Sequence, residues 1–410
     1  MRPIVVATVI LTVVAAYYVY RPLPNTLSDR WKFMFLDAIF RGFTRLGNLA
    51  YELGLSQDVF ILNHLMSRFG MLNPQSSESV RVTDTTFAGL PARVFESTSK
   101  GEGHHLKRGV VYFHGGGWTL GSGKMQPYDL QCRMMAEKLD AVIVSVDYRL
   151  APEARFPTQF NDALQASKQI LKMEVLAQYM IDPYRVAVSG DSAGGNLAAA
   201  VAQQMAMDET VPIKFKVQAL IYPALQALDF NTPSYQQNGN IPILYRPHMA
   251  LFWLRYLNGD ERLIPSLLVN NHTSLDQGHA AAEARAKVDW THLLPTAFHK
   301  DYKLVAPAHG TPGLIEELPG LLDVRAAPLL AEREVLKAVP PAYILTCEHD
   351  VLRDDGLMYW QRLEEAGVAV THDYYEDGFH GCMFFAFGPT RFSVGVRSLQ
   401  NYIQWLDKNL

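Results

Sequence analysis

The chain has 410 residues, of which 49% are hydrophobic and 19% are charged, so its composition excludes intrinsic disorder, collagen and long coiled coils. A formal net charge of −4 gives no overall positive field for nucleic acid, and no nucleic-acid partner is expected. The cysteines Cys132, Cys347 and Cys382 are odd in number and lack a C-x-x-C motif, which excludes a zinc-finger type of site and a dense disulfide framework. One disulfide at most can form, and its pairing stays open.

An apolar segment begins the chain. Residues 4–20 carry no charge and are flanked by Arg2 and Arg21. As a helix, this segment would be about 26 Å long, close to the hydrocarbon thickness of the endoplasmic reticulum membrane. Its tyrosine-rich end favours a retained signal-anchor over a cleaved signal peptide, whose apolar part is usually shorter and ends in small residues. We therefore predict a transmembrane anchor over residues 1–24, with a cleaved signal peptide or a buried core helix as the alternatives.

The next region, residues 25–78, is predicted to be a helical N-terminal cap. Apolar residues recur at helical spacing from Trp31, are interrupted at Gly54 and resume from Val59. This pattern predicts two amphipathic helices. They would form either a lid or membrane-docking surface beside the anchor, or ordinary packing on the main core, and the pattern alone does not separate these roles.

Strands and helices alternate through most of residues 79–410. The strand-like runs are residues 80–83, 92–95, 109–113, 141–146, 186–189, 219–222, 342–346 and 370–375. The helical patterns lie near residues 128–139, 160–179, 193–207, 355–366 and 392–409. This alternation predicts an α/β fold with a mostly parallel central sheet and helices on both faces. The alternation stops between about residues 228 and 323, so we predict a cap insertion there.

The strongest chemical signal is a G-x-S-x-G motif, formed by residues 190–194. It lies between a predicted strand and an alanine-rich helix, which is the context of a nucleophile elbow. Both glycines are needed because the turn is tight enough for side chains to collide with neighbouring backbone. The motif therefore predicts that Ser192 is an exposed nucleophile, activated by a nearby base.

A second motif, H-G-G-G-W, follows the predicted strand at residues 109–113. It consists of His114, Gly115, Gly116 and Gly117, with a tryptophan after them. Glycines allow backbone amides to approach the oxyanion of a tetrahedral intermediate. We predict that the amides of Gly115, Gly116 and Ala193 form the oxyanion hole, and that His114 braces the loop rather than acting as a base.

Two later loops supply an acid and a base in the chain order that this type of hydrolase requires. Asp350 follows a predicted strand, at the end where open α/β sheets carry their functional loops. His380 lies in the loop after the last predicted strand. Asp354 and Asp355 are predicted to cap the following helix. The sequence thus predicts a catalytic triad of Ser192, Asp350 and His380.

These motifs resemble those of the hormone-sensitive lipase and arylacetamide deacetylase branch of the α/β-hydrolases. The shared stretches include HGGGW, DYRLAPE, GDSAGG, DVLRDDG and the final YIQWLDKNL, and the likeness covers essentially the whole chain. The resemblance implies a serine esterase of the endoplasmic reticulum membrane, single-pass and type II, with its catalytic domain in the lumen. It also implies cholesteryl esters and acetylated ether-linked monoglycerides as substrates, and no metal or organic cofactor.

Two other functions stay open beside this resemblance. A xenobiotic amidase or esterase of the arylacetamide deacetylase type shares every predicted catalytic residue. A non-catalytic binding module on the same fold is the third candidate, although the complete set of catalytic residues argues against it. The oligomeric state has no signature in the sequence.

The chain also departs from that branch at specific positions. The resemblance implies that arylacetamide deacetylase has a cysteine just after the tryptophan of its HGGGW motif. This sequence has Thr119 there, so a disulfide from that position to Cys347 cannot form. The one N-x-[ST] sequon begins at Asn271, which is therefore the candidate N-glycosylation site. Glycosylation there would agree with a lumenal catalytic domain.

Overall fold

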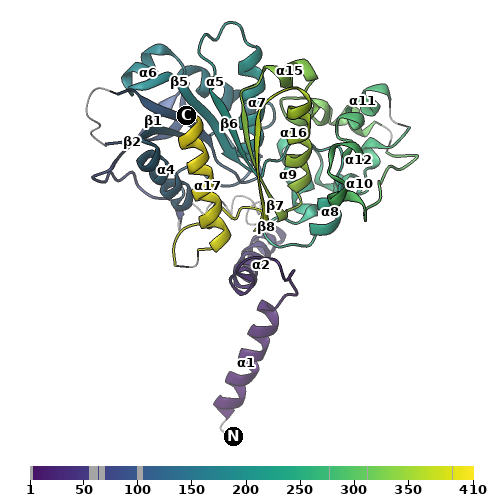
Figure 1. The fold of residues 1–410 in the computed structure, drawn as a ribbon. Coiled ribbons are helices and arrows are strands. Elements are labelled where there is room, and N and C mark those ends of the chain that lie inside the picture. The colour runs from purple at the N-terminus through teal and green to yellow at the C-terminus, as the bar shows by residue number, and fades with distance from the viewer. Residues whose placement is uncertain are drawn as a thin grey trace.

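A β-sheet of eight strands forms the centre of the protein (Figure 1). The computed structural model describes residues 3–54, 63, 70–98, 105–276, 278–311, 313–389 and 391–410. The strands are β1 (Val80–Phe87), β2 (Leu90–Ser97), β3 (Lys107–Phe113), β4 (Ala141–Val146), β5 (Ile181–Asp191), β6 (Val217–Ile221), β7 (Ala342–His349) and β8 (Val370–Phe379). They lie side by side in the order β1-β2-β4-β3-β5-β6-β7-β8.

Most of this sheet is parallel, as predicted. β1 pairs with β2 and β2 with β4 in antiparallel register, whereas all neighbours from β4 to β8 are parallel. Every residue of β4 is buried, because helices cover both faces of the sheet. The prediction of an α/β fold with a mostly parallel sheet is therefore confirmed.

Helices pack on the two faces of the sheet in separate apolar cores. One face carries α4 (Gln126–Leu139) and α17 (Ser393–Asn409). The other carries α5 (Thr158–Ile170), α6 (Met173–Gln178), α7 (Ala193–Met207), α15 (Arg333–Ala338) and α16 (Arg353–Glu365). The single helix predicted near residues 160–179 is two helices, α5 and α6, because the backbone is extended at Lys172.

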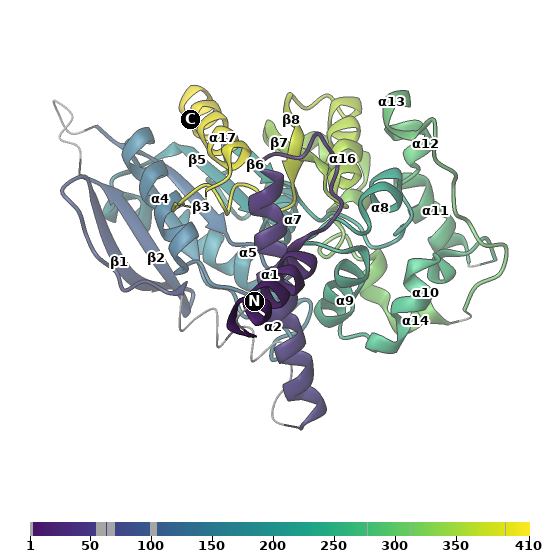
Figure 2. The same cartoon turned by 90° about the horizontal axis from the view of Figure 1, so that it is seen from below.

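The predicted insertion is built from short helices in the part of it that the structure describes. These are α8 (Pro233–Asn238), α9 (Arg246–Leu257), η1 (Glu261–Leu263), α10 (Ile264–Leu268), η2 (Asn271–Thr273), α11 (His279–Lys287), α12 (Trp290–Leu293), α13 (Thr296–His299), α14 (Leu314–Glu317) and η3 (Pro319–Leu322), with η4 (Pro328–Leu330) just after them. They gather at one end of the molecule (Figure 2). The Trp118 ring stacks on Tyr256 of α9 at a centroid distance of 4.3 Å, so the insertion shares a core with the sheet. The predicted domain boundaries stay predictions.

The N-terminal region extends away from this body (Figure 1). α1 (Pro3–Val19) covers most of the predicted anchor, and none of its residues is buried. Within the described residues, no helix reaches both the length and the hydropathy expected of a membrane-spanning segment. α2 (Arg30–Glu52) corresponds to the first predicted amphipathic helix. The second, from Val59 onward, lies outside the described residues.

One aromatic side chain fastens α2 to the body. Phe33 is fully buried, and its ring centroid lies 4.4 Å from Phe379 and 6.2 Å from Phe392. The amide of Ser28 donates a hydrogen bond to the Asp377 carbonyl at 3.0 Å. The start of α2 is therefore packed against the segment that ends β8.

Removing this ring should loosen the N-terminal region. We predict that Phe33→Ala lowers the free energy of unfolding by about 3 kcal/mol, because it leaves a cavity between α2 and β8. The same substitution at Phe35, which is 52% exposed, should change it by less than about 0.5 kcal/mol. Thermal denaturation followed by circular dichroism measures both variants, and equal losses of stability would contradict the packing described.

Candidate active site

A sharp turn joins β5 to α7 and carries Ser192. The φ and ψ angles of Ser192 are 56° and −118°, an unusual conformation for a residue with a side chain. A Cβ atom on Gly194 would lie 2.0 Å from the Phe113 carbonyl oxygen, and one on Gly190 would lie 2.3 Å from the Gly194 carbonyl oxygen. Only glycine fits at both positions, because the turn lies directly against the backbone of β3.

Three side chains meet at the ends of neighbouring parallel strands. His380 Nε2 lies 2.9 Å from Ser192 Oγ, and His380 Nδ1 lies 2.8 Å from Asp350 Oδ2. Ser192 follows β5, Asp350 follows β7 and His380 follows β8. The structure therefore brings together the three residues of the predicted triad in the expected order of contacts, and their catalytic roles stay a prediction.

Ser192 is more enclosed than the sequence suggests. Ser192 and His380 are each only 8% exposed, whereas the elbow motif predicts an exposed serine. Side chains of the insertion lie close to the loops of the site, with Phe252 against Gly117 and Ile243 near Gly381. The five-residue motif contains no information about such long-range neighbours.

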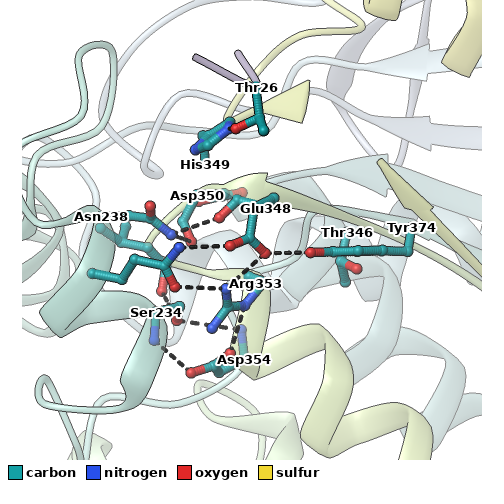
Figure 3. Close-up of polar contacts among 12 residues, drawn as sticks. Thr26, Ser234, Asn238, Thr346, Glu348, His349, Asp350, Arg353, Asp354 and Tyr374 are labelled. Carbon is teal, nitrogen blue, oxygen red and sulfur yellow. Dashed lines mark hydrogen bonds and ion pairs between the residues drawn. The ribbon is translucent and has the colours of Figure 1, made fainter. Parts of the chain in front are cut away.

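The insertion also holds the loop that carries Asp350 (Figure 3). Asn238 of α8 donates from Nδ2 to the carbonyl oxygens of Glu348 at 2.7 Å and Asp350 at 3.1 Å. The amide of Leu352 donates to Asp350 Oδ1 at 2.8 Å, which leaves Oδ2 for the histidine. Both the backbone and the carboxylate of Asp350 are therefore fixed by hydrogen bonds.

A buried guanidinium lies behind this loop. Arg353 is 1% exposed and contacts Glu348 Oε2 at 2.8 Å and Asp354 Oδ1 at 2.9 Å. The Tyr374 hydroxyl donates to the same oxygen of Glu348, as Figure 3 shows. Burial alone would lower the pKa of the Arg353 guanidinium. The carboxylates of Asp354 and Glu348 outweigh this effect, so the pKa lies above its ordinary value.

Asp354 and Asp355 do not cap α16, contrary to the prediction. The N-cap residue is Leu352, and no side chain caps that end. Asp354 Oδ2 instead accepts from the Ser234 amide at 2.6 Å, and Asp355 Oδ2 accepts from the Leu225 amide at 2.8 Å. Both carboxylates are directed toward the segment after β6, whose buried amides need acceptors.

In the H-G-G-G loop, the amides that are free to bind an oxyanion are not all the predicted ones. The Gly115 amide donates to Asp191 Oδ1 at 3.0 Å and to the Tyr128 hydroxyl at 2.9 Å, so it is not available to an oxyanion. Within the described residues, no acceptor takes a hydrogen bond from the amides of Gly116, Gly117 or Ala193. Gly117 is therefore the candidate donor that the sequence missed, in place of Gly115.

The positive φ angles of Gly116 and Gly117, 113° and 61°, explain this change of partner. The loop turns back at these two residues, and a Cβ atom on Gly116 would lie 2.0 Å from the Leu120 carbonyl oxygen. A run of three glycines shows that the backbone can turn sharply, but it does not show in which direction each amide points. His114 braces the loop, with its ring stacked on Tyr148 at 4.5 Å.

Asp191, the residue before the serine, holds the loop in place. Its carboxylate is 4% exposed and accepts from the Tyr112 and Tyr128 hydroxyls, each at 3.0 Å, as well as from the Gly115 amide. Burial raises the pKa of the Asp191 carboxyl, and the two tyrosine donors oppose this rise. Burial also raises the pKa of both tyrosines, so their hydroxyls stay protonated as donors. The sequence offers one sign of this role, since Asp191 is an acidic residue at the end of a strand that contains an apolar run.

The remaining predicted positions lie outside this arrangement. The Sγ atoms of Cys347 and Cys382 are 3.7 Å apart as buried free thiols, and Cys132 is also buried. Asn271 begins η2 and is half-buried, and the hydroxyl of Thr273 in its sequon donates to the Leu228 carbonyl.

The sequence profile of the alpha/beta hydrolase fold family matches residues 110–310 and 313–384, which is more than half of the chain. The chain is an α/β-hydrolase. It aligns over 410 residues with neutral cholesterol ester hydrolase 1 of Pongo abelii, at 55% identity and with 100% of both chains covered. Arylacetamide deacetylase of Oryctolagus cuniculus is 44% identical over 405 residues, with 99% of each chain covered. The family resemblance predicted from the motifs is confirmed.

Solved structures share the fold of this α/β-hydrolase. An α/β-hydrolase enzyme from the metagenome of Lake Arreo matches with a TM-score of 0.64 and 24% identity, covering 94% of this chain and 99% of its own. A thermophilic, thermostable carboxylesterase cloned from a metagenomic library matches with a TM-score of 0.60 and 26% identity, covering 86% and 95%. Both likenesses support the architecture described above.

Loss of the Asp191 carboxylate should impair turnover in this α/β-hydrolase. We predict that Asp191→Ala lowers kcat for a short-chain ester by about a hundredfold with a smaller change in KM, because the loop with the free amides loses its support. Asp407→Ala is the matched control, since that carboxylate is exposed and lies in α17. Steady-state kinetics on variants with native circular dichroism measure the effect. An unchanged kcat in Asp191→Ala would contradict the role assigned to this carboxylate.

Proposed function

We propose that this protein is a serine hydrolase that cleaves carboxylic esters of hydrophobic lipids. The observation that carries the proposal is the continuous hydrogen-bonded chain from Ser192 through His380 to Asp350. Among the residues that the structure describes, the amides of Gly116 and Gly117 in the H-G-G-G loop and of Ala193 at the start of α7 have no hydrogen-bond partner. A nucleophile, a base, an acid and oxyanion donors together suit acyl transfer.

In the first step, Ser192 Oγ attacks the ester carbonyl and its proton moves to His380 Nε2. The carbonyl oxygen becomes negatively charged and is stabilised by the amides of Gly116, Gly117 and Ala193. His380 then gives the proton to the leaving alcohol oxygen, the bond from carbonyl carbon to that oxygen breaks, and an acyl-serine remains.

In the second step, water replaces the alcohol. His380 takes a proton from the water, whose oxygen attacks the acyl carbon, and Ser192 leaves after regaining a proton from the imidazole. Asp350 remains ionised and accepts from Nδ1, which fixes the ring orientation and stabilises the imidazolium formed in each step. No metal or organic cofactor takes part in this sequence of bonds.

The substrates we propose are cholesteryl esters and acetylated ether-linked monoglycerides. The support for cholesteryl esters is identity of 54–55% over the full chain with proteins named neutral cholesterol ester hydrolase 1. The monoglycerides rest on the family resemblance of the motifs alone. Proteins named arylacetamide deacetylase are 43–44% identical, so a xenobiotic amidase or esterase is the second candidate. The binding-module alternative is weakened, because the contacts of a working triad are intact.

We also propose that α1 anchors the protein in the endoplasmic reticulum membrane as a single-pass type II protein with a lumenal catalytic domain. The support is the uncharged sequence of residues 4–20 and its tyrosine-rich end. On this arrangement Asn271 can carry an N-glycan. Endoglycosidase treatment of microsomal protein that leaves its gel mobility unchanged would argue against that glycan.

The function can be tested with three substrates measured side by side on the full-length, membrane-anchored protein. We expect hydrolysis of a cholesteryl ester and of an acetylated ether-linked monoglyceride to exceed hydrolysis of an aryl acetamide, and Ser192→Ala to abolish all three activities. Thr98→Ala is the matched control for the substitution, since Thr98 directly follows β2, which two strands separate from β5 in the sheet. Preferred cleavage of the aryl acetamide would support the second candidate, and no Ser192-dependent hydrolysis at all would refute the enzyme.

A further inference from the structure

In the part of the chain that the structure describes, α2 carries a row of exposed apolar side chains. Its members are more than half exposed and lie three, four or seven positions apart, which places them on one face of the helix. They are Trp31, Phe35, Ile39, Leu46 and Leu49 of α2, and Leu53, the residue that directly follows the helix. This row, called here the α2 stripe, extends about 33 Å along the helix. Exposed apolar surface of this extent marks an interaction site in a soluble domain.

The α2 stripe faces away from the body. Phe33 and Asp37 are buried on the other side of the helix, where Phe33 packs on Phe379 and Asp37 accepts from the Tyr245 hydroxyl at 2.7 Å. Phe33 and Asp37 thus hold one face of the helix to the body, and within the described residues the side chains of the α2 stripe stay more than half exposed.

Contacts of one tyrosine join the end of α1 to the middle of α2. Tyr18, near the end of α1, donates to the Ala38 carbonyl at 3.3 Å, and the Arg41 guanidinium lies 4.6 Å from the Tyr18 ring centroid. Tyrosine is enriched where a spanning helix leaves the bilayer. Figures 1 and 2 together show that α2 runs crosswise to α1. A helix that lies in the plane of a membrane has this orientation relative to a helix that spans the membrane.

Charge along this region suits lipid headgroups. Between residues 21 and 52, basic side chains outnumber acidic ones by two. Arg45 lies 5.3 Å from the Tyr18 ring, at the same level as Arg41. Cationic side chains beside an apolar helix face bind phosphate groups at the bilayer surface.

We propose that the α2 stripe docks into the surface of a phospholipid bilayer, with α2 lying parallel to it. This inference rests on the proposed anchoring of α1 and deepens it, because it seats the catalytic domain on the membrane. Phe33 packs on Phe379, the neighbour of His380, and Thr26 lies 2.9 Å from His349, the neighbour of Asp350. Docking through α2 therefore places the triad loops next to the source of an apolar ester.

Nitroxide labels on single introduced cysteines can locate α2 in phosphatidylcholine vesicles that contain the full-length protein. The three native cysteines are buried, so they do not compete for the label. The sites are Leu46→Cys on the α2 stripe, Glu52→Cys on the polar side as the matched control, and Leu11→Cys within α1. Collision with oxygen reports lipid, and collision with a water-soluble nickel complex reports solvent.

We expect the label at position 46 to favour oxygen and the label at position 52 to favour nickel. Nickel access at position 46, with position 11 shielded, would overturn the docking and leave the anchor. Protection of position 46 from both reagents would mean protein contact, such as a second copy, and would also overturn the docking. Nickel access at positions 11 and 46 overturns both proposals, whereas access at position 11 alone supports docking without an anchor.

An activity ratio provides an independent test. The ratio is the rate on a cholesteryl ester in phosphatidylcholine vesicles divided by the rate on a water-soluble short-chain ester. We expect Leu46→Glu to lower it roughly tenfold, because a carboxylate replaces an apolar contact with lipid. Leu106→Glu is the matched control, since Leu106 is 47% exposed and directly precedes β3. It lies at the amino end of that strand, whereas the triad residues follow the carboxyl ends of theirs, so the ratio should not change. An unchanged ratio in Leu46→Glu would overturn the docking.

Discussion

A buried carboxylate connects the two loops on which the active site is built. Asp191 ends β5 immediately before the candidate nucleophile, and it accepts hydrogen bonds from Gly115 at the start of the H-G-G-G loop and from two tyrosines beneath it. A charge in this position is stabilised only when its donors are in place, because burial otherwise disfavours it. The position of the serine and that of the free amides are therefore fixed by the same group.

Close contact between backbones imposes the second constraint. Gly194 lies so near the Phe113 carbonyl, and Gly116 so near the Leu120 carbonyl, that no side chain fits at either position. The insertion adds a third connection, since Asn238 holds the carbonyl oxygens of Glu348 and Asp350. Asn238 thus connects the insertion to the backbone of the candidate acid, and we expect a substitution in the insertion to alter the position of Asp350.

The sequence predicted those elements whose form depends mainly on the residues within the element itself. The bounds of β4 and α7 agree with the predicted residues, because a run rich in valine and isoleucine favours a strand and an alanine-rich run favours a helix. Ser192, Asp350 and His380 could be selected because motif and chain order restrict each of them to one loop. The break between α5 and α6 comes from the extended backbone at Lys172, and the burial of Ser192 is a property of the folded chain that the five-residue motif does not contain.

The direction of individual hydrogen bonds was beyond the sequence. Gly115 and Gly117 are the same residue type in the same loop, yet one amide is bound to Asp191 and the other is free, which depends on φ angles that glycine does not restrict. Asp354 and Asp355 have the composition of a helix cap, but buried amides after β6 attract their carboxylates instead. Competition between partners that are far apart in the chain decided both cases.

The central claim is that Ser192 is a nucleophile activated by His380 and Asp350. Labelling of the full-length protein with a fluorophosphonate probe tests it most directly, since the probe forms a covalent bond only with an activated serine. The account predicts one label per chain, located on Ser192 by peptide mass, and no label in Ser192→Ala. A folded wild-type protein that is not labelled, or a Ser192→Ala variant labelled equally, would contradict it.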